Sequence, residues 1–128
     1  AKEALKNNIP VGLGTDASCP LVTPYDMWRE VYYFAEFYGV SNAFAIYTAT
    51  LKNAQILGID DITGSIDVGK QADLIVVKEN PLENLKSLRK VNMVMVGGKL
   101  IESPKYERHE QIDEWLDSLS TQGRNVCL

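Results

Sequence analysis

Val11-Gly12-Leu13-Gly14-Thr15-Asp16 has the pattern of a short apolar strand that ends in a carboxylate. In α/β proteins, catalytic and ligand-binding groups gather at the carboxyl ends of the strands. A carboxylate in that position can bind a divalent metal, and it can take a proton from a metal-bound water. Asp16 can equally be a turn residue that accepts hydrogen bonds from backbone N–H groups. The stretch therefore predicts an α/β fold and leaves two roles open for Asp16.

The residues before this stretch have the pattern of a helix that leads into a strand. Ala1, Ala4 and Leu5 are spaced as on one face of a helix. Asn7-Asn8 favours the end of that helix, and Ile9-Pro10 favours a turn. A helix that leads directly into a buried strand is typical of a repeating α/β unit, in which each strand needs neighbours. We therefore expect this chain to be a piece of a longer α/β protein.

Length and composition limit the possible functions. The chain has 128 residues, 45% of them hydrophobic and 23% charged, with a net charge of −4. It is long enough for one core but far short of the roughly 250 residues of a complete eight-stranded α/β barrel. A net negative charge argues against nucleic-acid binding. No apolar run approaches the ~20 residues of a membrane span. Cys19 and Cys127 lack the spacing of a metal or redox motif, so we expect a cytoplasmic protein. Together with the charge and the short apolar runs, this predicts no nucleic-acid or membrane partner.

Two helices are predicted after the strand. Thr23 is a suitable N-cap for a helix that ends at Gly39. The next helix begins at Ser41 or Asn42, and Gly58 is suited to its end.

The second half of the chain changes to strand-like spacing. Leu74-Ile75-Val76-Val77 predicts a strand that is buried on both faces, and residues 82–88 predict a helical turn or two. Residues 91–101 predict a hairpin, because Gly97-Gly98 supplies the positive φ angles of a two-residue turn. Beyond Pro104, apolar residues recur at helical spacing and predict an amphipathic helix.

Several short motifs resemble those of one enzyme superfamily in their order and spacing. They are Val11-Gly12-Leu13-Gly14-Thr15-Asp16; Ala49-Thr50, Asn53-Ala54 and Leu57-Gly58; Gly64-Ser65-Ile66 and Gly69-Lys70-Gln71-Ala72-Asp73-Leu74-Ile75-Val76-Val77; and Asn80-Pro81-Leu82 with Val94-Met95-Val96-Gly97-Gly98-Lys99. The series is similar to that of the amidohydrolase superfamily, the metal-dependent hydrolases of cyclic amides, dipeptides and amino-heterocycles. It covers residues 1–103, and within the superfamily it most resembles the imidazolonepropionase-like and prolidase-like dipeptidase branch.

This resemblance implies a fold in three parts. Residues 1–58 correspond to the last strand and helices of a (β/α)8 TIM barrel. Residues 59–103 correspond to part of a small β-sandwich with a hairpin, which strands from the N-terminus complete in the family. Residues 104–128 lie beyond the resemblance and are expected to form the C-terminal amphipathic helix and a tail.

The resemblance also implies roles for individual residues. Asp16 corresponds to a metal ligand that also acts as the general base toward the attacking water. Ser18 and Cys19 directly follow Asp16 in the chain, so we expect them to line the substrate pocket. The metal is divalent, and zinc is expected. The family's histidine ligands would all lie before residue 1, and His109 is expected on a surface helix. We therefore expect a C–N bond hydrolase of small-molecule substrates as the parent protein, and an inactive chain without a firmly bound metal when these 128 residues are alone.

Two hypotheses compete with hydrolysis. The chain can be a non-catalytic binding or self-assembly module that uses the same piece of fold, or a structural domain in which Asp16 is a turn residue. In each case, barrel elements without their neighbours expose apolar faces, so we expect a homo-oligomer.

Overall fold

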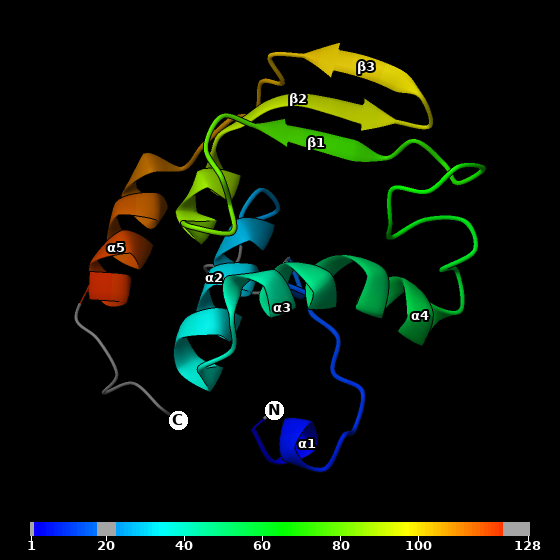
Figure 1. Ribbon diagram of the computed structural model, residues 1–128. Coiled ribbons are helices and arrows are strands. Elements are labelled where there is room, and N and C mark those ends of the chain that lie inside the picture. The colour runs from blue at the N-terminus through cyan, green and yellow to red at the C-terminus, as the bar shows by residue number, and fades with distance from the viewer. Residues whose placement is uncertain (1, 18–22, 122–128) are drawn as a thin grey trace.

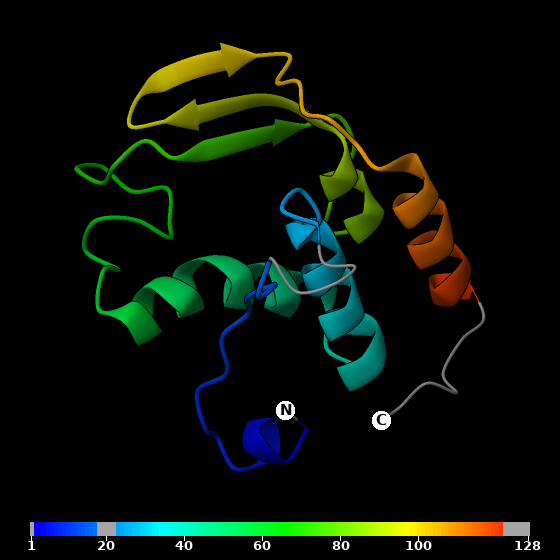
Figure 2. The ribbon, with the colours of Figure 1, turned by 180° about the vertical axis from the view of Figure 1, so that it is seen from behind.

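The structure, a computed structural model, describes residues 2–17 and 23–121 (Figure 1). The helices form one layer and a small sheet lies over them, an arrangement that Figure 2 shows from behind. In chain order the elements are α1 (Lys2–Lys6), α2 (Met27–Tyr38), α3 (Asn42–Tyr47), the π-helical turn η1 (Thr48–Lys52), α4 (Asn53–Leu57), β1 (Leu74–Val77), the 3-10 helix η2 (Leu85–Arg89), β2 (Val91–Val96), β3 (Lys99–Glu102) and α5 (Glu110–Thr121). Within the described ranges, no helix is both long and apolar enough to cross a membrane.

Helix α2 begins later than the sequence predicts. Thr23 is not its N-cap, because the helix starts at Met27 and Asp26 precedes it directly. The Thr23 hydroxyl instead donates a hydrogen bond to the Asp26 carboxylate at 2.6 Å, and the Asp26 N–H donates to the Thr23 carbonyl at 3.2 Å. Residues 23–26 therefore form a turn before the helix. The predicted end at Gly39 is confirmed.

The second helix is interrupted by a π turn. Its start is confirmed at Ser41, whose Oγ accepts a hydrogen bond from the Phe44 N–H at 3.2 Å, and it ends at Gly58 as predicted. Between these ends, the hydroxyls of Thr48 and Thr50 each donate to the carbonyl four residues earlier, at 2.8 and 2.7 Å. Such bonds compete with the regular helix ladder and bend helices. The extra residue of the π turn changes the face that the following residues present, and Asn53 is the first of these.

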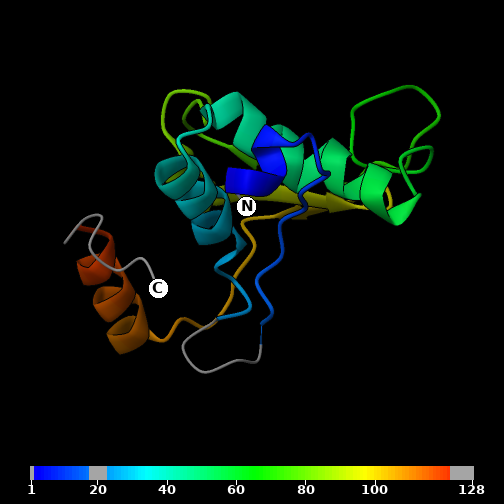
Figure 3. The same cartoon turned by 90° about the horizontal axis from the view of Figure 1, so that it is seen from below.

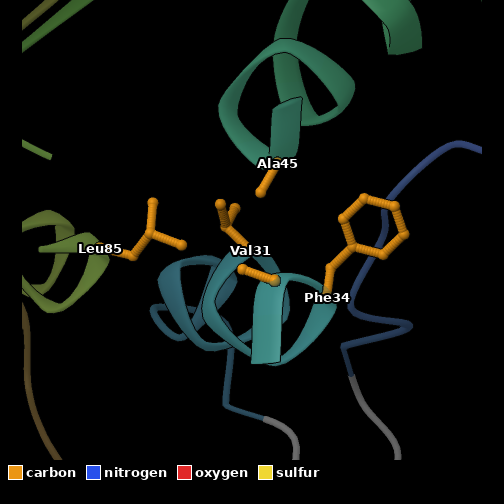
Figure 4. Close-up of a cluster of buried hydrophobic side chains, with 5 residues drawn as sticks. Val31, Phe34, Ala45 and Leu85 are labelled. Atoms are coloured by element: carbon orange, nitrogen blue, oxygen red, sulfur yellow. The ribbon is translucent and has the colours of Figure 1, made fainter. Parts of the chain in front are cut away.

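The core is small and centres on α2. Val31, Phe34 and Ala35 of this helix are buried against Ala45 of α3 and Leu85 of η2 (Figure 4). Seen from below, α2 lies between α5 and the run from α3 to α4 (Figure 3). The helical layer is therefore organised around α2.

The three strands form an antiparallel sheet in the order β1-β2-β3. The predicted hairpin is confirmed: Gly97 and Gly98 have φ angles of 54° and 78°, and the Gly97 N–H donates to Asp73 Oδ1 at 2.7 Å. The expectation that β1 is buried on both faces is wrong for this structure. Ile75 and Val76, which point to opposite faces, are 54% and 46% exposed, because the described residues place β2 along one edge of β1 and no tightly packed layer over either face.

Candidate functional site

Asn53 holds the segment that leads to Asp16. Its side-chain Nδ2 donates a hydrogen bond to the Leu13 carbonyl oxygen at 2.8 Å, and its Oδ1 accepts one from the Leu13 N–H at 2.9 Å. A neighbouring strand satisfies a residue's backbone N–H and C=O in the same way. One side chain of α4 therefore occupies the place of a strand neighbour for Leu13.

Gly12 makes this contact possible. A Cβ atom at Gly12 would lie 2.7 Å from Asn53 Oδ1 and 3.4 Å from Ile56 Cδ1. The first separation is too short for two non-bonded atoms, so any larger residue would displace the amide. The glycine thus lets the backbone and α4 approach closely enough for both hydrogen bonds to form.

The predicted strand at residues 11–13 is not part of the sheet. The sheet contains β1, β2 and β3, and residues 11–13 form no ladder with it. The prediction is wrong for this structure because an extended segment becomes a strand only beside another strand. Here the polar backbone groups of Leu13 are paired with the Asn53 amide instead.

Asp16 follows this segment in an unusual backbone conformation. It is exposed, with a φ of +50°. That left-handed region is uncommon outside glycine, and Asp and Asn enter it more readily than other side chains. Such residues cluster at functional sites, although turns contain them as well. Both roles predicted for Asp16 are compatible with this geometry. The substrate-pocket residues predicted beside it, Ser18 and Cys19, lie outside the described residues.

The described residues do not form a metal centre by themselves. A catalytic zinc takes about three protein ligands, and residues 2–17 and 23–121 contain no group of three His, Cys, Asp or Glu side chains that could hold a metal ion. His109, the one histidine of the chain, is exposed and lies directly before α5, with its backbone N–H bonded to the Tyr25 hydroxyl at 2.8 Å. Asp16 is therefore a candidate metal ligand, and the other ligands of such a metal would come from outside the described residues.

A buried arginine joins α2 to α5. The Arg29 guanidinium, 5% exposed, donates from Nε to Asp26 Oδ2 at 3.0 Å and from Nη1 to Asp117 Oδ1 at 2.7 Å. Its Nη2 lies 3.5 Å from Asp113 Oδ1. Arg89 of η2 donates to the second oxygen of Asp117 at 2.7 Å. No short motif in the sequence indicates this network, because Arg29 and Asp117 are 88 positions apart.

The network perturbs the titration of its members. Burial alone would lower the pKa of Arg29, but hydrogen bonds to Asp117 and Asp26 outweigh it and raise the pKa above its ordinary value. Burial alone would raise the pKa of Asp117, but hydrogen bonds from Arg89 and Arg29 hold it below the ordinary value. The charged forms are therefore the ones that fix α5 in place.

A hollow of about 140 Å³ lies beside the residue that precedes Asp16. It is lined by Thr15, Thr23, Asp26, Arg29, Glu30, Tyr33 and Leu116. Burial raises the pKa of Glu30, a residue of α2 that lines this hollow. The hollow thus brings together the end of the extended segment, the first turns of α2, and α5.

Comparison with known sequences shows the family. The Amidohydrolase family profile matches residues 1–101. Guanine deaminase of Escherichia coli (strain K12) is 34% identical over 100 residues, which are 73% of this chain and 22% of that protein. Imidazolonepropionase of Picrophilus torridus is 36% identical over 77 residues, 60% of this chain and 19% of that protein. The chain thus spans about a fifth of the length of these curated relatives.

Solved structures agree with the sequence relatives. A provisionally assigned prolidase from Bifidobacterium longum superposes with a TM-score of 0.89 at 38% identity, over 93% of this chain and 29% of that one. A Xaa-Pro dipeptidase with bound methionine gives a TM-score of 0.70 at 38% identity, over 80% of this chain and 24% of that one. The resemblance carried by the sequence motifs is confirmed, and this chain belongs to the amidohydrolase family.

Proposed function

We propose that this chain supplies the general base, Asp16, of an enzyme that hydrolyses a C–N bond. The relatives are hydrolases of that kind: a guanine deaminase, an imidazolonepropionase and a Xaa-Pro dipeptidase. The observation that supports the proposal is local. Asp16 is an exposed carboxylate in a left-handed conformation, at the end of a segment whose backbone Asn53 holds in place of a strand neighbour.

The reaction requires one proton acceptor. As a water oxygen bonds to the substrate carbon, Asp16 takes one proton from the water. The C–N bond then breaks, and the same proton passes to the leaving nitrogen, so that the carboxylate is regenerated. Amidohydrolases generally use divalent metals, which lower the pKa of a bound water. Zinc is our proposal for this protein; because the described residues do not complete a metal centre, its other ligands come from outside them.

The proposed setting is the end of a barrel. In this proposal, residues 11–13 pair with strand neighbours of a (β/α)8 barrel, and β1–β3 complete a small sandwich. The exposed Ile75 and Val76 on opposite faces of β1 support the sandwich, because they leave apolar surface that a second sheet can cover. Small-molecule substrates and a cytoplasmic location belong to the same proposal.

A segment exchange tests this function. The part of this chain that matches the Xaa-Pro dipeptidase, 80% of its length, replaces the corresponding 24% of that protein. The dipeptidase then supplies the rest of an amidohydrolase. We expect dipeptide hydrolysis that a chelator abolishes and a divalent metal restores. In that protein Asp16→Asn should reduce kcat at least a hundredfold, whereas Asp61→Asn, at an exposed carboxylate, should not. A folded, metal-loaded exchange protein without activity, or one that Asp16→Asn leaves active, contradicts the proposal.

Self-association is a second candidate function. Val76 and Leu100 lie on one face of the sheet and are 46% and 51% exposed, and Ile75 and Ile101 lie on the other at 54% and 49%. Exposed apolar surface on both faces favours burial against a second copy of the chain. Light scattering of the isolated chain would show a dimer or larger oligomer in this case, and a monomer at high concentration would contradict it.

A further inference from the structure

A second hollow, of about 180 Å³, is lined by residues of α2, η2 and α5. These residues are Trp28, Arg29, Tyr32, Tyr33, Lys86, Arg89 and Asp117. Three of them carry aromatic rings, three carry cations and one carries a carboxylate. Cavities of ~150 Å³ take a benzene molecule, so this hollow has room for one ring with a small substituent. We call it the aromatic hollow.

The aromatic wall of this hollow is fixed by neighbouring groups. Trp28 is 7% exposed, and its indole Nε1 donates a hydrogen bond to Asp26 Oδ1 at 2.8 Å. The centroid of the Tyr32 ring lies 6.4 Å from that of Trp28 and 5.7 Å from that of Tyr33. A wall that is already ordered loses little conformational entropy when a ligand binds.

The charges around the aromatic hollow leave one cation over. Three arginines and three aspartates form one connected set of ion pairs, namely Arg29, Arg89, Arg108, Asp26, Asp113 and Asp117. These six charges balance. Lys86 is exposed, and its Nζ lies 5.0 Å from the centroid of the Tyr32 ring. In the described part of the chain no carboxylate pairs with Lys86. One uncompensated positive charge beside aromatic rings matches a ligand with one negative charge.

Arg89 offers hydrogen-bond donors on the same side as this lysine. Its Nη1 donates to Asp117 Oδ2 at 2.7 Å, which is the one hydrogen bond of the guanidinium among the described residues. A guanidinium carries five N–H donors in a planar fork that suits a carboxylate. The side chain is 25% exposed, and its Cζ lies 5.4 Å from the centroid of the Trp28 ring. Arg89 therefore keeps donors for a ligand beside the aromatic wall.

We infer that the aromatic hollow binds a small aromatic carboxylate. The ring of the ligand packs against Tyr32 and Tyr33, in the offset or edge-to-face geometry that aromatic pairs prefer. The flexible stem of Lys86 brings its ammonium to the ligand carboxylate, and Arg89 donates to the same group. The inference uses neither Asp16 nor the reaction proposed above, so it goes beyond the proposed function.

Titration of the isotopically labelled 128-residue chain with sodium benzoate tests the inference, with the amide and indole NMR signals as the readout. Benzamide, which has the ring without the charge, and sodium acetate, which has the charge without the ring, are compared at the same ionic strength. We expect saturable shifts at Trp28, Tyr32 and Arg89 with benzoate, half complete below about 10 mM. Benzamide and acetate should each bind at least about tenfold more weakly. Equal binding of either comparison probe, or no saturable binding of benzoate, overturns the inference.

Variants assign the free positive charge to Lys86. Lys86→Gln should weaken benzoate binding at least about tenfold, and Lys86→Arg should retain it, because the charge is kept. The matched control is Lys90→Gln, at an exposed lysine that directly follows η2 and does not line the aromatic hollow. It should leave binding unchanged. Unchanged binding in Lys86→Gln, or an equal loss in Lys90→Gln, overturns the inference. Because the readout is binding and not hydrolysis, neither outcome alters the test of Asp16.

Discussion

Replacing Asn53 with alanine removes both hydrogen bonds that hold Leu13. Each bond, at 2.8 and 2.9 Å, is worth about 1 kcal/mol net in a partly buried setting. Alanine is the better helix former by about 0.6 kcal/mol and offsets part of that loss. We therefore expect Asn53→Ala to lower the free energy of unfolding by about 1.5 kcal/mol. Urea unfolding followed by far-UV circular dichroism measures it, with the exposed Gln55→Ala as the control on the same helix.

A double-mutant cycle with Gly12 tests the geometry itself. In the native chain, Gly12→Ala places a Cβ 2.7 Å from Asn53 Oδ1 and should displace the amide, at a cost of about 1–2 kcal/mol for the lost hydrogen bonds. In the Asn53→Ala background the clashing atom is absent, so the same substitution should cost much less. The two substitutions are therefore expected to be non-additive. Additive losses, or an Asn53→Ala protein as stable as the native chain, would refute the contact as the cause.

Three further predictions concern the rest of the molecule. Arg29→Met should destabilise the chain by about 3–5 kcal/mol in urea unfolding, because it removes the guanidinium that pairs with the buried carboxylates of Asp26 and Asp113. A loss below about 1 kcal/mol would contradict a structural role for the network. Since the pKa of Asp117 is lowered by its arginines, its contribution is present above the unfolded-state pKa of about 4 and is lost as the pH falls through the folded-state pKa. The stability advantage of the native chain over Asp117→Asn should therefore shrink below about pH 4, and a pH-independent difference would argue against the ion pairs. Placing Lys at Ile75 and Ile101, two exposed apolar residues on one sheet face, should reduce any self-association seen by light scattering, and an unchanged mass would exclude that face as the interface.

Local chemistry explains which elements the sequence could predict. Helix ends at Gly39 and Gly58, the Ser41 cap and the Gly97-Gly98 turn each depend on residues within a few positions of each other. The apolar spacing beyond Pro104 likewise predicted α5. These features follow from backbone preferences and short hydrogen bonds, which a sequence displays directly.

The rest depends on contacts between distant residues. The Asn53 side chain reaches Leu13, 40 positions away, and Arg29 reaches Asp117, 88 positions away. The motif that contains Asn53 indicated a family but not its hydrogen bonds. The sequence shows Glu30 only as one charged residue on a helix. The hollow that it lines is formed by residues from three separate parts of the chain, so the sequence could not predict it. Of the candidate site, the sequence therefore predicted Asp16 but neither what holds it nor what lies beside it.

Chemical rescue of Asp16 tests the central claim most directly. Glycine adopts the φ of +50° found at this residue without strain, so Asp16→Gly removes the carboxylate and spares the backbone. In the protein that combines this chain with the rest of the Xaa-Pro dipeptidase, the kcat for dipeptide hydrolysis is measured with increasing formate. We predict a loss of at least about a hundredfold, of which formate restores a saturable part, since it supplies the missing proton acceptor. An Asp16→Gly protein that keeps its rate, or one whose lost rate formate does not restore, would contradict the assignment of Asp16 as the general base.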